Sequence, residues 1–320
     1  MVASARTACA HCLPSCASRG RSHGKTQSIK AASSPSRHSP IGAWIPSRKG
    51  QNNAMSVDER TMFSVEEIVA TTLEIGRKLG PDRPLWHRGH TCPQHVLKAS
   101  LPRQIEDAKK LLPLEQRLIT RFRQRSLPYW PAGYPQNDWE QLFAMQHYGL
   151  PTRLLDWSEN LFVALYFASL KHEHLVDGKP VDCPPILWIL DPVGWNQQAQ
   201  QLKGFTDVGI LNTDAEDLKP YAPTGTELQR RYPQPLAIYG AHNSPRITAQ
   251  RGTFTITGDS LESMETFAAD HKEQSLWKLA LFISREDLQR DLASLGFSES
   301  MIFPDLASVA KEVTAMEGLK

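Results

Sequence analysis

The sequence predicts a single α+β domain in which helices pack around short mixed strands, preceded by a disordered tail. Three observations predict this class. Helical and strand patterns are mixed along the chain without a regular β-α-β order. The composition is that of a globular protein, with 40% hydrophobic and 22% charged residues. No apolar run is long enough for a membrane-spanning helix, so no membrane association is expected.

The N-terminal tail comprises residues 1–54, which hold eight Lys and Arg residues and no Asp or Glu. Few large aliphatic residues accompany them, so burial cannot offset the entropy of ordering, and disorder is predicted. An acid-free segment rich in Arg and Ser is typical of an organellar transit peptide. We favour the alternative that translation starts at Met55. The domain is then expected over 55–320, with its core at about 64–316.

A metal site is not expected in this tail. Cys9, Cys12 and Cys16 lie near His11 with loose ligand spacing, but no second ligand pair follows at a zinc-module distance. The five cysteines of the 320-residue chain are too few for a disulfide scaffold. A cytoplasmic location is expected, since the tail also lacks the apolar region of a secretory signal.

The body of the chain, residues 55–320, has 28 basic and 34 acidic residues, a net charge of −6. A nucleic-acid binder is expected to be basic, so nucleic acid is an unfavoured partner.

Helices are predicted from periodicity and from their end signals. Ser64 and Glu67 form a capping box for the first helix, and Gly80 ends it. A basic run at 117–125 is interpreted as a solvated helix face. Asp138 and Ser158 are the predicted caps of two central helices. The predicted helices cover residues 64–79, 104–125, 138–148, 159–171, 285–295 and 305–316.

Strands are predicted where short apolar runs lie between turn residues. One begins at Pro84 and brings Arg88 to its end, and the run at 185–191 is apolar throughout, as in a buried strand. Residues 126–137 and 192–234 are expected to be irregular. The other predicted strands cover residues 235–240, 253–257 and 275–283.

Polar and aromatic side chains are concentrated at residues 146–158, which we interpret as a loop between two helices. Loops held by rigid elements often carry functional residues. We expect this loop and Arg88 to line one cleft, and Arg153 and Asp156 to form an ion pair that fixes the loop. The alternative is that these polar groups only form hydrogen bonds with one another and stabilise the fold.

Three sequence blocks resemble the signature blocks of the FRG domain, a family found mostly in bacteria and phages. They are WHRG at 86–89, QHYGLPTRLLDWSENLFVALYFA at 146–168 and SPRITAQRGTFTI at 244–256. The family is named for an aromatic-Arg-Gly motif, and His87 occupies the aromatic position here. The resemblance identifies the family better than it identifies an activity.

The order of these blocks also resembles that of ADP-ribosyltransferases, which implies NAD as a substrate and no further cofactor. The catalytic candidates are then Arg88, Ser158, Gln250 and Asp156. Gln250 stands where a carboxylate is expected, and a neutral amide gives no charge to a developing cation. Asp156 or Glu159 is the substitute carboxylate. The ligand-binding candidates are Trp86, Gln146, His147, Tyr148, Thr152, Arg153 and Trp157, with the tryptophans and Tyr148 as stacking surfaces.

Two further functions are kept as alternatives. One is a non-catalytic module for ligand sensing or protein interaction in bacterial defence or stress response. It would bind a nucleotide or another phosphorylated small molecule. The neutral Gln250 in place of a carboxylate agrees better with such a module than with an enzyme. The other, a nuclease or nucleic-acid-binding component, ranks last because no paired carboxylates with metal-ligand spacing are evident.

Overall fold

The computed structural model describes residues 57–319, except for 131–132, 134, 172–173, 177–178, 182, 203–207, 224–230 and 241–243. The chain divides into two units, Met1–Gln51 and Asn52–Lys320, and the described residues belong to the second. The predictions of a disordered tail, of a start at Met55 and of no metal site at Cys9–Cys16 lie outside the described residues.

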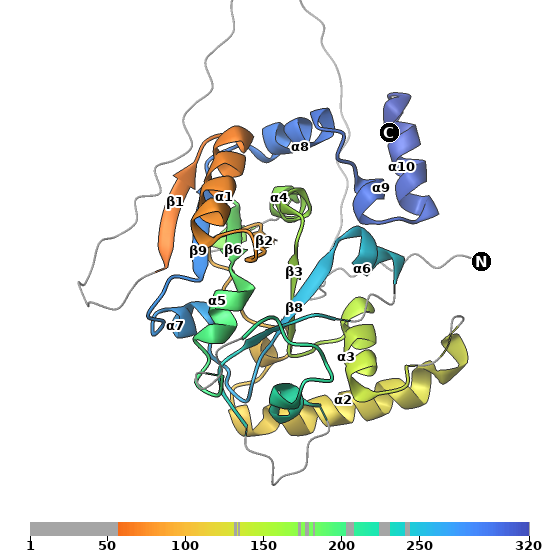
Figure 1. Ribbon diagram of the computed structural model, residues 1–320. Helices are drawn as coiled ribbons and strands as arrows, with labels where there is room; N and C mark the ends of the chain where they lie inside the picture. The colour runs from red at the N-terminus through yellow and green to blue at the C-terminus, as the bar shows by residue number, and fades with distance from the viewer. Residues whose placement is uncertain are drawn as a thin grey trace, which may run out of the picture. The chain divides into compact units, whose positions relative to one another are not determined.

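A seven-stranded mixed sheet forms the centre of the domain (Figure 1). Its order is β1-β9-β6-β2-β3-β8-β7; β1 and β9 are parallel, and the other neighbours are antiparallel. The strands are β1 (Asp58–Met62), β2 (Trp86–His90), β3 (Leu154–Ser158), β6 (Ile186–Leu190), β7 (Leu236–Ile238), β8 (Gly252–Ile256) and β9 (Leu276–Leu281). A separate hairpin joins β4 (His174–Val176) and β5 (Lys179–Val181).

The helices are α1 (Val65–Leu79), α2 (Leu111–Ser126), α3 (Asp138–His147), α4 (Leu161–Ser169), α5 (Pro192–Gln197), α6 (Pro245–Ala249), α7 (Met264–Ala268), α8 (Arg285–Ser294), α9 (Glu299–Ile302) and α10 (Leu306–Met316). Short 3₁₀ turns occur at Pro102–Gln104, Ala108–Lys110, Leu127–Tyr129 and Glu216–Tyr221. Within the described ranges, no helix has the length and apolar character needed to cross a membrane.

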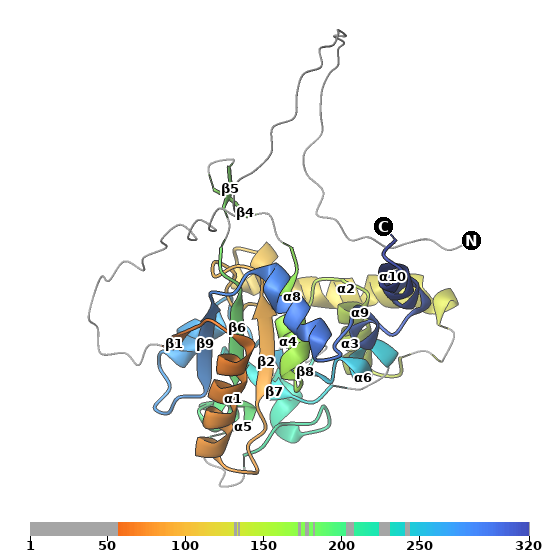
Figure 2. The same cartoon turned by 90° about the horizontal axis from the view of Figure 1, so that it is seen from above.

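Helices cover both faces of the sheet, which explains why β6 is apolar throughout. Leu187 and Ile189 belong to the apolar cluster that includes residues of α1, α4 and α8, and Figure 2 shows these three helices over the sheet. Trp188 and its neighbours on the same side pack against residues of α5 and α7. A third apolar cluster joins α2 and α3 to β3, β7 and β8. This end of the sheet carries the candidate site.

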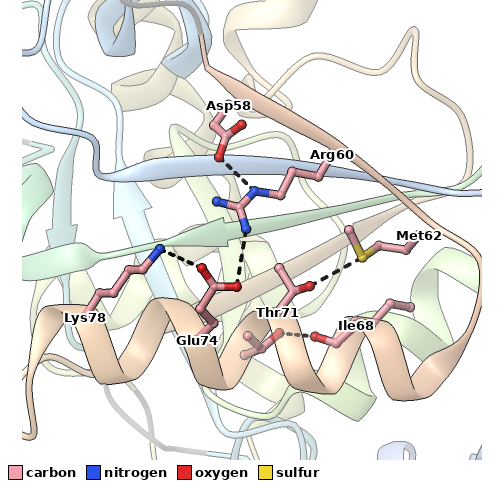
Figure 3. Close-up of polar contacts among 8 residues, drawn as sticks. Asp58, Arg60, Met62, Ile68, Thr71, Glu74 and Lys78 are labelled. Carbon is pink, nitrogen blue, oxygen red and sulfur yellow. Dashed lines mark hydrogen bonds and ion pairs between the residues drawn. The ribbon is translucent and has the colours of Figure 1, made fainter.

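Strand β1 is an edge strand that the sequence analysis did not predict. Its sequence lacks an apolar run, and polar contacts with α1 hold it in place beside β9 (Figure 3). The guanidinium of Arg60 donates to Asp58 at 2.9 Å and lies 3.8 Å from Glu74, which also binds Lys78 at 2.6 Å.

Most predicted helices and strands are confirmed, with ends that shift by a few residues. The helix predicted from residue 104 is the exception, because α2 begins at Leu111. Ser64 caps α1 as expected, because its hydroxyl accepts from the backbone N–H of Glu67. The other two caps were wrong by one and two residues: Asn137 caps α3 and Asn160 caps α4. In both cases an Asn side chain accepts from the first helical turn. Helices around a mixed sheet confirm the α+β class.

The interpretation of residues 146–158 as an interhelical loop was wrong, because Leu154–Ser158 is β3, which pairs with β8 and β2. Four of its five residues are buried and Asp156 is exposed. Because Asp is disfavoured in strands, residue propensities do not predict a strand here. Pairing with a strand on each side determines the conformation of this segment.

Candidate functional site

The candidate site is a cleft at the point where β2 and β3 separate. These strands pair only at His87 and Ser158, whereas β2 pairs with β6 along all five residues. A cavity of about 370 Å³ lies beside the separated strands. Side chains of α3, α4 and α6 complete its walls.

Gly89 lets α4 approach β2 closely enough to form one wall. A Cβ atom at position 89 would lie 1.9 Å from the carbonyl oxygen of Ala164. No side chain fits at that distance, so only glycine is compatible with this packing. Val163, Ala164 and Phe167 of α4 consequently line the cavity.

Arg88 spans the gap between the two strands. Its Nη1 donates to the backbone oxygen of Asp156 at 2.5 Å, and its Nε donates to Nε2 of His90 at 3.0 Å. Burial lowers the pKa of Arg88 to about 10, which leaves the guanidinium charged at neutral pH. Arg88 lies in the middle of β2 rather than at its end, since the strand continues to His90.

The neutral ring of His90 orients the side chain of Arg88. Because Nε of Arg88 can only donate, Nε2 of His90 accepts, and the proton of the neutral ring is on Nδ1. Nδ1 lies 2.9 Å from the carbonyl oxygen of His95, to which it donates, and 3.3 Å from the indole Nε1 of Trp188. Burial and the charge of Arg88 lower the pKa of His90 far below its ordinary value. The imidazole is therefore neutral and fixes the direction of the guanidinium.

Asp156 is held by a chain of polar side chains. Its Oδ2 accepts from Nε2 of Gln146 at 2.6 Å, and Oε1 of Gln146 accepts from the hydroxyl of Thr152 at 2.5 Å. The Asp156 carboxylate also interacts electrostatically with Arg88 and Arg246. This series of hydrogen bonds keeps Oδ2 of Asp156 occupied.

The cleft has a positive charge balance. Among the residues that the structure describes, three arginines and four histidines line it, against one carboxylate, that of Asp156. Burial lowers the pKa of His87 to about 4 and also lowers that of His147, so these rings are neutral at pH 7. The arginines therefore dominate the field, and a cavity with this balance attracts anions. The three arginines are Arg88, Arg103 and Arg246.

Ser158 and Gln250 also line the cleft, but their polar groups serve the fold. The Ser158 hydroxyl donates to the backbone oxygen of Gln250 at 2.6 Å and accepts from the N–H of Asn160 at 2.9 Å. The Gln250 amide donates to the carbonyl oxygen of Ile302 at 3.3 Å. Glu159 pairs with Arg251 at 3.5 Å and does not line the cavity.

Comparison with known families gives a match to part of the chain. Residues 83–175 match the FRG domain family. The FRG domain is thus assigned to residues 83–175, less than a third of the chain. The matched segment includes β2, α3, β3 and α4, which together form most of the cleft. No curated protein and no solved structure shows a significant match to the chain.

The Arg-Gly pair of the FRG domain thus has two separate roles in this chain. Arg88 carries charge into the cleft, and Gly89 permits α4 to form its wall.

The predicted ion pair between Arg153 and Asp156 was wrong. Residues three apart on a strand point to opposite faces of the sheet. Arg153 is 1% exposed, pairs with Glu115 at 2.7 Å, and donates to the carbonyl oxygens of Thr257 and Tyr221. This arginine belongs to the core of the FRG domain and does not line the cleft.

Several predicted ligand-binding residues lie away from the cavity. Trp86 and Thr152 are wholly buried and do not line it. Trp157 lines it, but the indole is 3% exposed and donates to Thr255. Tyr148 is 60% exposed and lines a second pocket. These positions argue against Trp86, Tyr148 and Trp157 as stacking surfaces in the cleft.

Other lining residues were not predicted from the sequence. Arg246 and Phe167 lie within the quoted motif blocks, so their charge and aromatic character were the available signal. Arg103 follows no motif, and only the tertiary fold brings it to the cleft. The structure also adds His90, His95, Phe143 and Phe254. In the part of the chain that is described, no group of three potential metal ligands occurs.

Proposed function

We propose that the FRG domain binds a phosphorylated, nucleotide-type ligand in the cleft between β2 and β3, with NAD as the first candidate. The observation that carries this proposal is the excess of three arginines over one carboxylate around a cavity of about 370 Å³. Guanidinium groups match phosphate oxygens in pairs, and cavities of this volume are in the usual range for small-molecule ligands.

The other lining groups support a ligand that combines charge with a flat ring. Phe167, which is half-buried, contributes aromatic surface to the cavity, whereas Phe143 and Phe254 lie behind it as buried rings. Arg88 is held in one orientation by His90 and by the backbone of β3, so little side-chain entropy is lost when it binds an anion.

Calorimetry with the full chain and NAD tests this proposal. Arg88→Ala is expected to weaken binding about tenfold or more, since a charged hydrogen bond contributes about 1.5–3 kcal/mol. The matched control is Arg77→Ala, which removes an exposed arginine near the end of α1, outside the cleft. Absence of NAD binding, or equal affinity in all three proteins, would contradict the proposal.

Catalysis is a second candidate, and the position of Asp156 favours it. Its carboxylate is the negative charge in the cleft, and such a charge stabilises the oxocarbenium-like state formed when nicotinamide leaves ribose. In that reaction the C–N glycosidic bond breaks with its electrons moving to nicotinamide, and an acceptor hydroxyl or water supplies the new bond and releases a proton. Gln250 supplies no charge, so slow turnover is expected from the natural chain.

Nicotinamide release from NAD separates catalysis from binding alone. The expected pattern is slow release by the natural chain, faster release by Gln250→Glu, and loss of release when Arg88→Ala is added or when Asp156 is replaced by Asn. Binding without release in every variant would contradict catalysis and leave a ligand-sensing module.

A further inference from the structure

A second cavity of about 370 Å³ lies at the C-terminal end of α2, outside the cleft. Aromatic rings form most of its wall, and two of them are strongly exposed: Tyr129 by 79% and Tyr148 by 60%. The lining residues are Phe122, Arg125, Ser126, Tyr129, Trp130 and Tyr148. We call this cavity the aromatic pocket.

The rings of the aromatic pocket support one another. Trp130 meets Phe122 and Tyr148 edge to face, with centroids 6.1 and 6.0 Å apart, and Phe122 lies 6.4 Å from Tyr148. The indole N–H of Trp130 donates to the hydroxyl of Ser126 at 3.0 Å. The polar atom of the indole is thus satisfied within the pocket wall, and a ring that enters the pocket meets aromatic surface.

A row of three arginines runs along α2 beside this pocket. Arg117, Arg121 and Arg125 follow one another at four-residue spacing, which places them about 6 Å apart along one helix face. All three are exposed, and none forms an ion pair within the described ranges. Arg123, by contrast, pairs with Asp138. Arg125 belongs both to the row and to the pocket.

We propose that α2 and the aromatic pocket bind single-stranded nucleic acid. A strand alternates anionic phosphates with flat rings, and this combination matches a row of free guanidinium groups beside an aromatic pocket. In this arrangement Arg117, Arg121 and Arg125 contact successive phosphates, and one base enters the pocket. An unpaired base exposes both ring faces, which a base in a duplex does not.

The net charge of −6 for residues 55–320 does not oppose this proposal. Charges on a protein surface are screened beyond about 8 Å at physiological ionic strength, so the local row of arginines determines the field that a strand meets. The proposal is also independent of the nucleotide proposed for the cleft. The two cavities are neighbours, since His147 lines the cleft and the ring of Tyr148 lies 4.9 Å from the His147 ring.

Fluorescence anisotropy with the full chain and a labelled single-stranded oligothymidine of about 12 nucleotides tests the proposal. Binding is expected to weaken with salt. Replacement of Arg121 and Arg125 by Ala is expected to reduce the slope of log K against log salt by about 1.4, because each phosphate contact contributes about 0.7 for a single strand. The matched control replaces Arg77 and Lys78, two exposed cations of α1, and is expected to leave the slope unchanged.

Tyr129→Ala tests the aromatic part, because its side chain is exposed and its removal leaves the core intact. We expect about tenfold weaker binding to the oligonucleotide, the loss that follows from one stacked base. Heparin, which has charge but no bases, is expected to bind equally to the natural chain and to Tyr129→Ala.

The result that overturns the proposal is an oligonucleotide affinity that is absent or unchanged in the arginine and tyrosine variants. Stronger binding of an acidic, tyrosine-containing peptide than of the oligonucleotide would also overturn it and would indicate a protein partner. Arg88→Ala is expected to leave oligonucleotide binding intact, so failure of the nucleotide proposal for the cleft is distinguished from failure of this one.

Discussion

At the scale of single residues, similar side chains of this FRG domain have different environments and therefore different roles. Arg88 is held at the edge of a cavity, where its charge is available to a ligand. Arg153 is wholly buried and has Glu115 and two carbonyl oxygens as partners. The two arginines lie in different motif blocks, at 86–89 and 146–168, and their surroundings in the fold separate the two roles.

The Arg153–Glu115 pair provides a stability prediction. Glu115→Gln is expected to lower the free energy of unfolding by about 3–5 kcal/mol, because it leaves the buried charge of Arg153 uncompensated. Asp156→Asn is expected to change it by less than about 1 kcal/mol, since Asp156 is exposed. Urea unfolding of both variants measures the difference, and the reverse order would contradict this assignment of the ion pair.

His87 predicts how stability depends on pH. Burial lowers its pKa from 6.5 to about 4, so between these values the unfolded chain binds a proton that the folded chain does not. Stability is therefore complete above about pH 6.5 and falls as the pH drops toward 4, by about 3 kcal/mol at most for this group. His87→Phe is expected to show a smaller loss of melting temperature over this range. Equal pH dependence in both proteins would contradict the assignment.

At the scale of elements, the close packing of α4 on β2 determines the shape of the cleft. Gly89 marks this contact in the sequence. The structure explains why a glycine is needed, because the backbone of Ala164 occupies the place of a Cβ atom at position 89. Gly89→Ala is expected to destabilise the domain by at least about 2 kcal/mol, because a backbone atom and not a flexible side chain blocks the new methyl group. The matched control is Gly76→Ala in α1, where the nearest atom to a new Cβ is 3.7 Å away and a small gain is expected. Equal melting temperatures for the two variants would contradict this account of the packing.

Periodicity and caps were sufficient to predict most helices and the apolar strands, because α1 and β6 carry strong local signals. They were insufficient for β1 and β3. Polar residues in β1 contact α1, and Asp156 interrupts the pattern of β3, so pairing with distant strands decides both. The candidate site was predictable in part. Arg88, Asp156 and Gln250 lie in motif blocks and line the cleft, whereas Arg103 comes from a segment with no local signal.

At the scale of the whole domain, two cavities with different walls adjoin at the end of α3. The cleft is enclosed by the sheet and by α4 and α6, and arginines dominate its charge. The aromatic pocket is an exposed feature of α2 and its following turn. The two proposals accordingly assign a small phosphorylated ligand to the cleft and a longer partner to the aromatic pocket.

A comparison of ADP-ribose with adenosine tests whether the cleft recognises phosphate groups. Both contain the same base and ribose, but only ADP-ribose carries the charges that Arg88 and Arg246 are proposed to bind. Calorimetry on the full chain is expected to show binding of ADP-ribose that Arg88→Ala weakens about tenfold, and much weaker binding of adenosine. Equal affinity for the two ligands, or ADP-ribose binding that does not depend on Arg88, would contradict the account.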